Sequence, residues 1–333
     1  MANLDIFNPQ ISVLSYDLSG KTILVYGTNR TGKTRQLTRL PKPCYLAFES
    51  GINGIAGIPF FPMRKWSDFV KFVKQITTEK NIARAREMYQ TIILDEASIM
   101  GRICSEFVCE KYGVDRINDG NSGYGLWREY SSEFEKWLNL LTSVGFTVAF
   151  IAHEGTRDFN DESGEEYSKI YPAGDKRIID PICNLVDIIA YAAVNGTDDD
   201  GNEIKSSLYL TNTRKYHAGS RFDYLTGYIK EFTAENLQAA IEEAVRKQEE
   251  TDGVRAVDYI TQAQTQTAVE KTYDELNDEI KTIAKNMFEN EQGDAYKAIV
   301  EEHLGRGKGV QDTNPSQRQL LELILEDLQA LKE

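Results

Sequence analysis

The segment GTNRTGKT at residues 27–34 constrains the fold of this chain more than any other feature. It matches the pattern GxxxxGK[ST] at every position. The apolar run KTILVY, residues 21–26, precedes it, and a predicted helix that ends at Leu40 follows it. A buried strand, a glycine-rich turn and a helix in this order form a phosphate-binding P-loop. A plain glycine turn at a helix start is the alternative, but the apolar strand directly before the turn favours the P-loop.

The residue types in this loop suit a bound nucleotide. Glycines let the backbone wind so that successive N–H groups face phosphate oxygens, and the start of a helix adds positive potential. Lys33 supplies charge for the β- and γ-phosphates, and Thr34 can place its hydroxyl on Mg²⁺. A guanine signature of the NKxD kind is not evident after the fourth predicted strand, so we expect ATP with Mg²⁺. The predicted nucleotide-binding residues are Gly27, Thr28, Asn29, Arg30, Thr31, Gly32, Lys33, Thr34 and Arg35.

Carboxylates follow two further predicted strands. Asp95 comes directly after the apolar run TIIL and is the expected Walker B residue, which holds Mg²⁺ together with Thr34. Alone, such a carboxylate can be a solvated strand end, but the P-loop upstream favours the metal role. Either Glu96, next to Asp95, or Glu49, at the end of the preceding predicted strand, could polarise the attacking water. An AAA-type layout favours Glu96 and a RecA-type layout favours Glu49; the strand order and the expected hairpin extension favour Glu49.

His153 ends the fourth predicted strand, residues 146–152. A polar side chain at this place can contact the γ-phosphate and report its loss to the segment that follows. That segment, residues 154–169, is charged and poorly periodic, and we predict a long loop there. A core or surface histidine without such a role is the alternative, and the charged segment beside His153 favours the switch.

Strands and helices alternate through most of the chain. The predicted strands are residues 21–26, 44–48, 91–94 and 146–152, and the predicted helices between them are residues 66–89, 99–112 and 127–143. Such alternation is typical of a parallel, doubly wound sheet. Residues 186–194 and 207–212 flank TDDDGN, in which Asp200-Gly201 is a hairpin turn signal. We therefore expect an antiparallel pair that extends the sheet.

The C-terminal part has a different composition. A closing helix is predicted at residues 232–246, and the Gln- and Thr-rich run TQAQTQT follows in a polar linker. Two later helices are predicted, the second starting at Asn314-Pro315, an N-cap followed by proline. Their apolar positions are Leu276, Ile280, Ile283 and Met287, and Leu320, Ile324 and Leu328. We predict a RecA-like ATPase core at residues 1–248, a polar linker at 249–270 and a small α-helical C-terminal domain at 271–333.

Charge and hydropathy limit the expected partners. With 52 acidic and 38 basic residues, the chain has a formal net charge of −14 and does not suit coating nucleic acid by bulk electrostatics. Any contact with DNA must be a local basic patch or loop. No run of about 18 apolar residues is present, and the N-terminus lacks the features of a secretory signal. We expect a cytoplasmic protein with no membrane partner.

Five segments together resemble a known family. In order they are GTNRTGKT, YLAFES, TIILDEAS, FTVAFIAHE and RKYHAGSRF. Their order and spacing resemble those of the RecA-core phage ATPases in the Sak group of single-strand annealing proteins, over about residues 10–245. This resemblance implies a RecA fold, ATP hydrolysis and homo-oligomers on single-stranded DNA. It also implies recombination or annealing beside a single-strand-binding protein or another replication or recombination protein.

The resemblance also implies further site residues. In such assemblies a neighbouring subunit supplies a cation to the γ-phosphate, and Arg214, Lys215 and Arg221 lie where this cation is expected. A solvated basic loop is the alternative. Loops after the third and fourth strands would contact DNA, with candidates Lys169, Lys176, Arg177, Tyr167 and Tyr171. Packing is the alternative role of these aromatic rings, and the acidic composition departs from what the family leads us to expect.

Two other functions remain open. A ring helicase or loader-type motor would share every phosphate-site residue and differ in unwinding duplex DNA. A nucleotide-gated protein-binding module with little turnover would use the acidic C-terminal region for a partner. Lys33, Thr34, Asp95 and both glutamates are all present, which argues against the second alternative.

Overall fold

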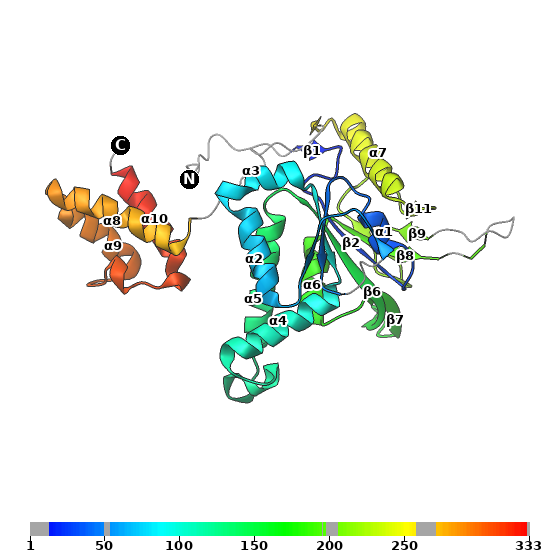
Figure 1. The fold of residues 1–333 in the computed structure, drawn as a ribbon, viewed down its shortest axis with the longest axis horizontal. Coiled ribbons are helices and arrows are strands. Elements are labelled where there is room, and N and C mark those ends of the chain that lie inside the picture. The colour runs from blue at the N-terminus through cyan, green and yellow to red at the C-terminus, as the bar shows by residue number, and fades with distance from the viewer. Residues whose placement is uncertain (1–12, 50–53, 195, 198–205, 258–270, 332–333) are drawn as a thin grey trace. The chain divides into compact units, whose positions relative to one another are not determined.

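The computed structural model describes residues 13–49, 54–194, 196–197, 206–257 and 271–331. The chain divides into two compact units, residues 1–267 and residues 268–333. In Figure 1 the first unit runs in colour from blue to yellow, and the second is orange and red. No helix within the described ranges is long and apolar enough to cross a membrane.

A mainly parallel sheet forms the centre of the first unit. Its parallel strands are β2 (Thr22–Gly27), β3 (Pro43–Ala47), β4 (Phe60–Pro62), β5 (Thr91–Asp95), β6 (Thr147–Asn160) and β8 (Ile188–Ala193), in spatial order β8-β2-β6-β5-β3-β4. Beyond β8, β9 (Ser207–Tyr209) and β11 (Tyr228–Ile229) continue the sheet with antiparallel pairing, and β10 (Gly219–Ser220) also pairs with β8. The predicted parallel sheet with an antiparallel extension is confirmed. The predicted turn at Asp200-Gly201 lies outside the described residues.

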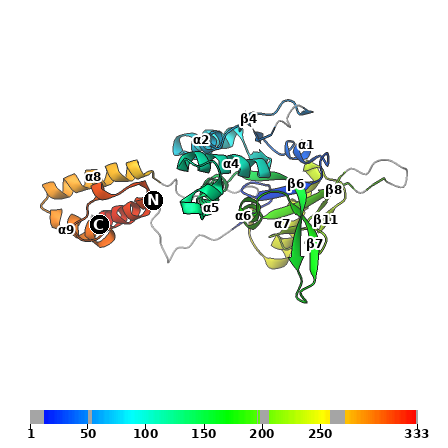
Figure 2. The same ribbon diagram turned by 90° about the horizontal axis from the view of Figure 1, so that it is seen from below.

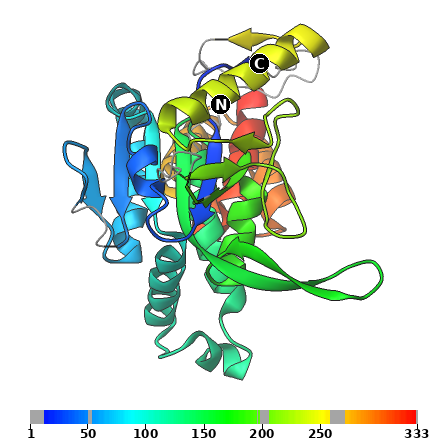
Figure 3. The same cartoon turned by 90° about the vertical axis from the view of Figure 1, so that its right-hand side faces the viewer.

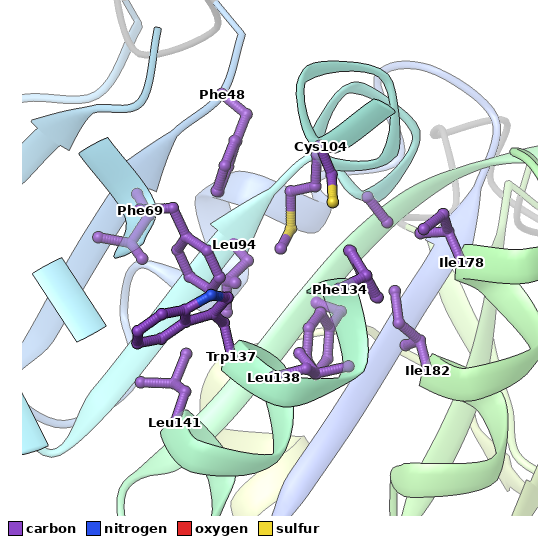
Figure 4. Close-up of a cluster of buried hydrophobic side chains, with 14 of the residues drawn as sticks. Phe48, Phe69, Leu94, Cys104, Phe134, Trp137, Leu138, Leu141, Ile178 and Ile182 are labelled. Atoms are coloured by element: carbon purple, nitrogen blue, oxygen red, sulfur yellow. The ribbon is translucent and has the colours of Figure 1, made fainter. Parts of the chain in front are cut away.

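Helices cover both faces of the sheet. Side chains alternate along a strand, so Leu24 and Tyr26 of β2 face one side, and Ile23 and Val25 face the other. The first side packs against α2 (Trp66–Thr77), α3 (Glu79–Met88), α4 (Ala97–Tyr112), α5 (Trp127–Thr142) and α6 (Lys176–Leu185). Figure 4 shows part of this core, where side chains of four helices pack near Leu94 of β5. The second side packs against α1 (Lys33–Leu37) and α7 (Ala234–Asp252).

Three elements differ from the sequence prediction. The helix predicted at residues 66–89 is two helices, because Thr78, a β-branched residue, is extended between α2 and α3 (φ −66°, ψ 142°). The sequence does not predict α6, since Pro181 in its interior argues against a helix. Helix α7 continues to Asp252, inside the predicted linker, and ends at Gly253, whose φ of 67° is left-handed. A short strand β12 (Ala256–Val257) then pairs with β1 (Leu14–Ser15).

The second unit is a bundle of α8 (Tyr273–Glu289), α9 (Gly293–Leu304) and α10 (Arg318–Ala330) around one apolar core. The side chain of Thr272 caps α8 by accepting from the N–H of Glu275, whose carboxylate accepts from the N–H of Thr272 at 2.7 Å. Six of the seven predicted apolar positions are buried in this core, and Leu320 packs partly buried against it. The sequence does not predict α9. Asn314 caps a short 3₁₀ turn before α10 and not α10 itself.

Candidate functional site

The predicted P-loop joins β2, a central strand of the sheet, to α1. Gly27 ends β2 with a φ of +154°, and a Cβ atom there would lie 2.0 Å from the carbonyl oxygen of Ala192 in β8. Gly32 precedes α1 in the left-handed region, with a φ of 81°. Only glycine adopts these conformations without strain or collision. The two glycines of the motif are therefore required by the backbone path itself.

Lys33 lies inside the loop. Its side chain is buried, and Nζ donates to the carbonyl oxygens of Gly27 (2.8 Å) and Thr28 (2.7 Å). Burial lowers the pKa of Lys33, while the carboxylates of Asp95 and Glu154 raise it. The loop thus keeps a cation at its centre, held by neutral acceptors that phosphate oxygens can replace.

Asp95 links the P-loop to the rest of the sheet. Its Oδ2 atom accepts from Thr34 Oγ1 at 2.7 Å and from the hydroxyl of Tyr45 at 2.9 Å. Burial raises the pKa of Asp95, and these two hydrogen bonds act in the opposite direction. The two predicted metal ligands therefore meet at the ends of neighbouring elements. Sequence reasoning missed Tyr45, although a hydroxyl inside the apolar strand CYLAF signals a buried polar contact.

The two candidate bases have different surroundings. The N–H groups of Phe48 and Glu49 donate to the Asp95 carbonyl oxygen at 2.8 and 3.3 Å, which keeps Glu49 at this edge of the sheet. Partial burial raises the pKa of Glu49, and nearby Asp95 raises it further. Glu96 is buried at the start of α4, where its Oε1 accepts from Ser98 and from the N–H of Ile99. One oxygen of Glu96 therefore already stabilises a helix end.

His153 lies beside the P-loop, in register with Gly27 on the adjacent strand. Its Nδ1 atom is buried and has no hydrogen-bond partner among the described residues. The next residue, Glu154, accepts a hydrogen bond from the hydroxyl of Tyr191 in β8 at 3.0 Å. Sequence reasoning did not single out Glu154, since its contact depends on a strand far along the chain. His153 therefore keeps a buried ring nitrogen that no described residue hydrogen-bonds, at the strand position beside Gly27.

The loop predicted after His153 is wrong. β6 continues to Asn160 and pairs antiparallel with β7 (Glu166–Pro172), so a long hairpin projects from the sheet (Figures 2 and 3). Its rings pack along the hairpin, with Phe159 and Tyr167 centroids 5.9 Å apart. At the tip, Asp161 accepts from the N–H groups of Ser163 and Glu165, as turn residues do. Alternating charged residues on the exposed face made this strand pair look aperiodic in sequence.

The three predicted trans-acting cations lie in two parts of the first unit. Arg221 donates to Asp187 Oδ1 (3.3 Å), and Asp187 accepts from the N–H of Thr22, so Arg221 lies at the opposite end of β2 from the P-loop. Arg214 forms ion pairs with Asp161 and Glu165, each at 3.3 Å, and Lys215 is exposed.

Several residues predicted to contact DNA are engaged elsewhere. Lys169 is 7% exposed and donates to Asn212 at 2.7 Å, and Tyr171 is 8% exposed. Lys176 and Arg177 begin α6 instead of lying in a loop, and the Arg177 guanidinium stacks on Trp127 at 3.9 Å. Tyr167 packs within the hairpin under Arg214. Burial therefore removes Lys169 and Tyr171 from any exposed binding surface.

Comparisons with known proteins agree with this geometry. Residues 19–222 match the AAA domain family, a span that contains the P-loop, Asp95 and His153. The chain is 46% identical over 328 residues to the SPbeta prophage-derived uncharacterized protein YorG of Bacillus subtilis (strain 168), and the match covers 98% of each chain. The sheet order, the P-loop and the contact between Thr34 and Asp95 fit nucleotide binding. The chain therefore belongs to the AAA domain family of nucleotide-hydrolysing P-loop ATPases.

Proposed function

We propose that this protein hydrolyses ATP with Mg²⁺ and couples the reaction to work on single-stranded DNA, in phage-type recombination, annealing or replication. The observation that carries the ATPase part is the 2.7 Å hydrogen bond from Thr34 to Asp95, beside the buried ammonium of Lys33. The prophage origin of the 46% identical relative supports the phage setting. The resemblance to RecA-core annealing ATPases supports DNA as the effector.

The residues of the loop suit a triphosphate. Gly27 leaves no side chain against β8, and Lys33 Nζ can exchange the carbonyl oxygens of Gly27 and Thr28 for phosphate oxygens. Thr34 and Asp95 offer the oxygen ligands that Mg²⁺ prefers. When bound, the ion neutralises charge on the phosphates. These residues thus account for binding and for part of the charge stabilisation that hydrolysis needs.

The match to the AAA domain family favours Glu96 as the general base, but we assign this role to Glu49, because one oxygen of Glu96 is already engaged at the start of α4. The Glu49 carboxylate is half-buried, and the raised pKa makes it a better proton acceptor than an exposed glutamate. Glu96 already caps α4 with one oxygen and has the supporting role. His153 then senses the γ-phosphate through its unpaired Nδ1 and passes the change to the β6–β7 hairpin, because both lie on one continuous strand.

Assembly would complete the site. A neighbouring copy would supply a cation to the γ-phosphate, as arginine fingers do, and of the three predicted residues Arg214, Lys215 and Arg221 we assign this role to Arg221. The Arg221 side chain is 58% exposed, and its ion pair with Asp187 and its hydrogen bond to the Asn184 carbonyl oxygen lie at the surface, where such pairs contribute little stability. A single-strand-binding protein or another replication protein is the expected partner on DNA.

The test is ATP hydrolysis by the full-length protein with and without single-stranded DNA. Lys33→Ala should abolish turnover, and Glu49→Gln should reduce it by about 100-fold or more while ATP still binds. The matched variant Glu96→Gln keeps an oxygen for the α4 cap and should retain most activity. If Glu96→Gln lost turnover and Glu49→Gln retained it, the general base would be Glu96.

DNA dependence separates the remaining functions. Strong stimulation by single-stranded DNA with strand annealing supports the proposal, whereas unwinding of a duplex would assign a helicase-type motor. Turnover that DNA does not change would overturn the DNA part and leave an ATPase with another effector.

A further inference from the structure

A row of tyrosines crosses four neighbouring strands in register. Tyr26 of β2 lies opposite Tyr191 of β8, Tyr191 lies opposite Tyr209 of β9, and Tyr209 lies opposite Tyr228 of β11. Their successive ring centroids are 5.2, 6.1 and 5.1 Å apart. Tyr216 packs on two of them, 5.3 Å from Tyr191 and 5.0 Å from Tyr209. These five residues are called the tyrosine row.

Exposure increases along the row toward the sheet edge. Tyr26 is fully buried and Tyr191 is 9% exposed, whereas Tyr209 and Tyr216 are half-buried and Tyr228 is 42% exposed. The residues directly before and after these tyrosines along the strands face the opposite side of the sheet, where they pack against α7. The hydroxyls of Tyr26, Tyr191 and Tyr228 hydrogen-bond to the His217 carbonyl oxygen, to Glu154 and to Ser207, so the rings are held in place. The outer part of the row is therefore an aromatic surface.

Cations flank this surface. Lys215 directly precedes Tyr216, and Lys230 follows β11; both side chains are exposed. Arg214, which precedes Lys215, is 56% exposed but is ion-paired with Asp161 and Glu165. Exposed rings with adjacent cations suit single-stranded nucleic acid, whose bases can stack while its phosphates contact the cations. A duplex would not suit this surface, since its bases are already stacked on each other.

The inner end of the row reaches the nucleotide site. Tyr26 immediately precedes Gly27, and its hydroxyl donates to the carbonyl oxygen of His217 at 2.6 Å. Tyr191 donates to Glu154, the residue after His153. A ligand on the outer tyrosines would thus contact a continuous series of packed rings that ends at both the P-loop strand and the strand of His153.

We propose that Tyr209, Tyr216 and Tyr228 form a stacking platform for the bases of single-stranded DNA, with Lys215 and Lys230 contacting its phosphates. The inference rests on the proposed function, because it names where the DNA effector binds. The proposed site for the DNA strand therefore lies along β9 and β11 and not on the β6–β7 hairpin.

The experiment measures binding of fluorescein-labelled dT20 to the full-length protein by fluorescence anisotropy, with ATP hydrolysis followed in parallel. Tyr228→Leu and Tyr216→Leu should weaken binding by about five- to 150-fold each, the range for losing one stacked base. Tyr228→Phe keeps the ring and should bind as the wild type does. Tyr124→Leu, at a tyrosine that is 84% exposed and outside the row, is the matched control and should change nothing.

A second measurement needs no substitution. Photocrosslinking of dT20 that carries 5-iododeoxyuridine should give adducts on Tyr209, Tyr216 or Tyr228, identified by mass spectrometry. Adducts found only elsewhere would overturn the platform, even if the leucine variants failed to fold.

The outcomes also separate the two proposals. If dT20 binds and stimulates the wild type but the leucine variants bind equally well, the platform is wrong and the proposed function stands. Equal affinity for a duplex of the same length would show phosphate contact without stacking, which also overturns the platform. If the wild type neither binds dT20 nor responds to it, the platform and the DNA part of the proposed function are both wrong.

Discussion

Single residues at the P-loop show which parts of the site are visible in sequence. The motif predicts the roles of Lys33 and Thr34 from local spacing, and Asp95 is predicted because it directly follows an apolar strand. Tyr45 and Glu154 escape prediction because their partners, Asp95 and Tyr191, come from distant strands that only the folded sheet brings close. Local motifs can therefore be predicted from one sequence, whereas the contacts that orient the motif residues cannot.

Tyr45 offers a test of such an orienting contact. Tyr45→Phe removes one of the two donors to Asp95 Oδ2 and should raise the Mg²⁺ concentration for half-maximal hydrolysis by about tenfold. Tyr130→Phe is the matched control, since Tyr130 is also buried but donates to the Gly101 carbonyl oxygen, away from the site. Both variants should lose stability by about 1–3 kcal/mol. An unchanged Mg²⁺ requirement in Tyr45→Phe would show that this hydroxyl has only a structural role.

Gly27 gives a second prediction at this scale. In Gly27→Ala the new methyl group would meet the Ala192 carbonyl oxygen, so the P-loop strand and β8 must separate. We expect loss of binding of a fluorescent ATP analogue and a lower unfolding temperature, from strain of about 1–3 kcal/mol or more. Gly219→Ala, where a Cβ atom meets nothing within 4 Å, should leave both measurements unchanged. Normal nucleotide binding by Gly27→Ala would contradict the close approach.

Among the elements, the parallel strands are predicted because strands buried on both faces are continuous apolar runs. The β6–β7 hairpin is missed because its exposed face carries charges between Phe159, Tyr167 and Tyr171, and alternation over so few residues is weak. Helix α6 is missed because Pro181 contradicts helical propensity, and packing of Ile178 and Ile182 in the core outweighs that penalty. Tertiary burial, which no local pattern contains, decides both cases.

The contact between the hairpin and the segment before β10 should depend on pH. His217 stacks on Tyr171 with ring centroids 4.5 Å apart. Burial, together with the charges of Lys169 and Arg157, lowers the pKa of His217 from 6.5 to about 4, while Asp180 acts in the opposite direction. The folded protein therefore binds fewer protons here than the unfolded chain. The stability that this contributes is complete above pH 6.5 and is lost as the pH falls toward 4.

The measurement is urea unfolding of wild type and His217→Phe at pH 7 and pH 5. Phenylalanine keeps a ring against Tyr171 but does not titrate, so the variant should lose less stability on acidification. Because His217 is partly exposed, the difference should be about 1 kcal/mol. Parallel losses in the two proteins would show that His217 does not titrate in this window.

At the scale of the whole molecule, the two units have separate apolar cores. The bundle core of α8, α9 and α10 contains only residues of the second unit, and the two cores of the first unit contain none of them. Separate cores should unfold as separate cooperative units. The sequence predicts this division from the polar, Gln- and Thr-rich segment, although the described part of the first unit extends to Val257.

Ile324→Ala tests this independence in the full-length protein. Ile324 is fully buried in the bundle core, and its truncation should cost about 2–5 kcal/mol, a large share of the stability of so small a unit. Calorimetry should then show that the second unit unfolds at a lower temperature. The unfolding temperature of the first unit, whose transition is the one that ATP shifts upward, should not change. Leu237→Ala, equally buried in the first unit, should have the opposite pattern. If both substitutions moved one common transition, the two units would unfold together, and nucleotide binding would stabilise the C-terminal bundle as well.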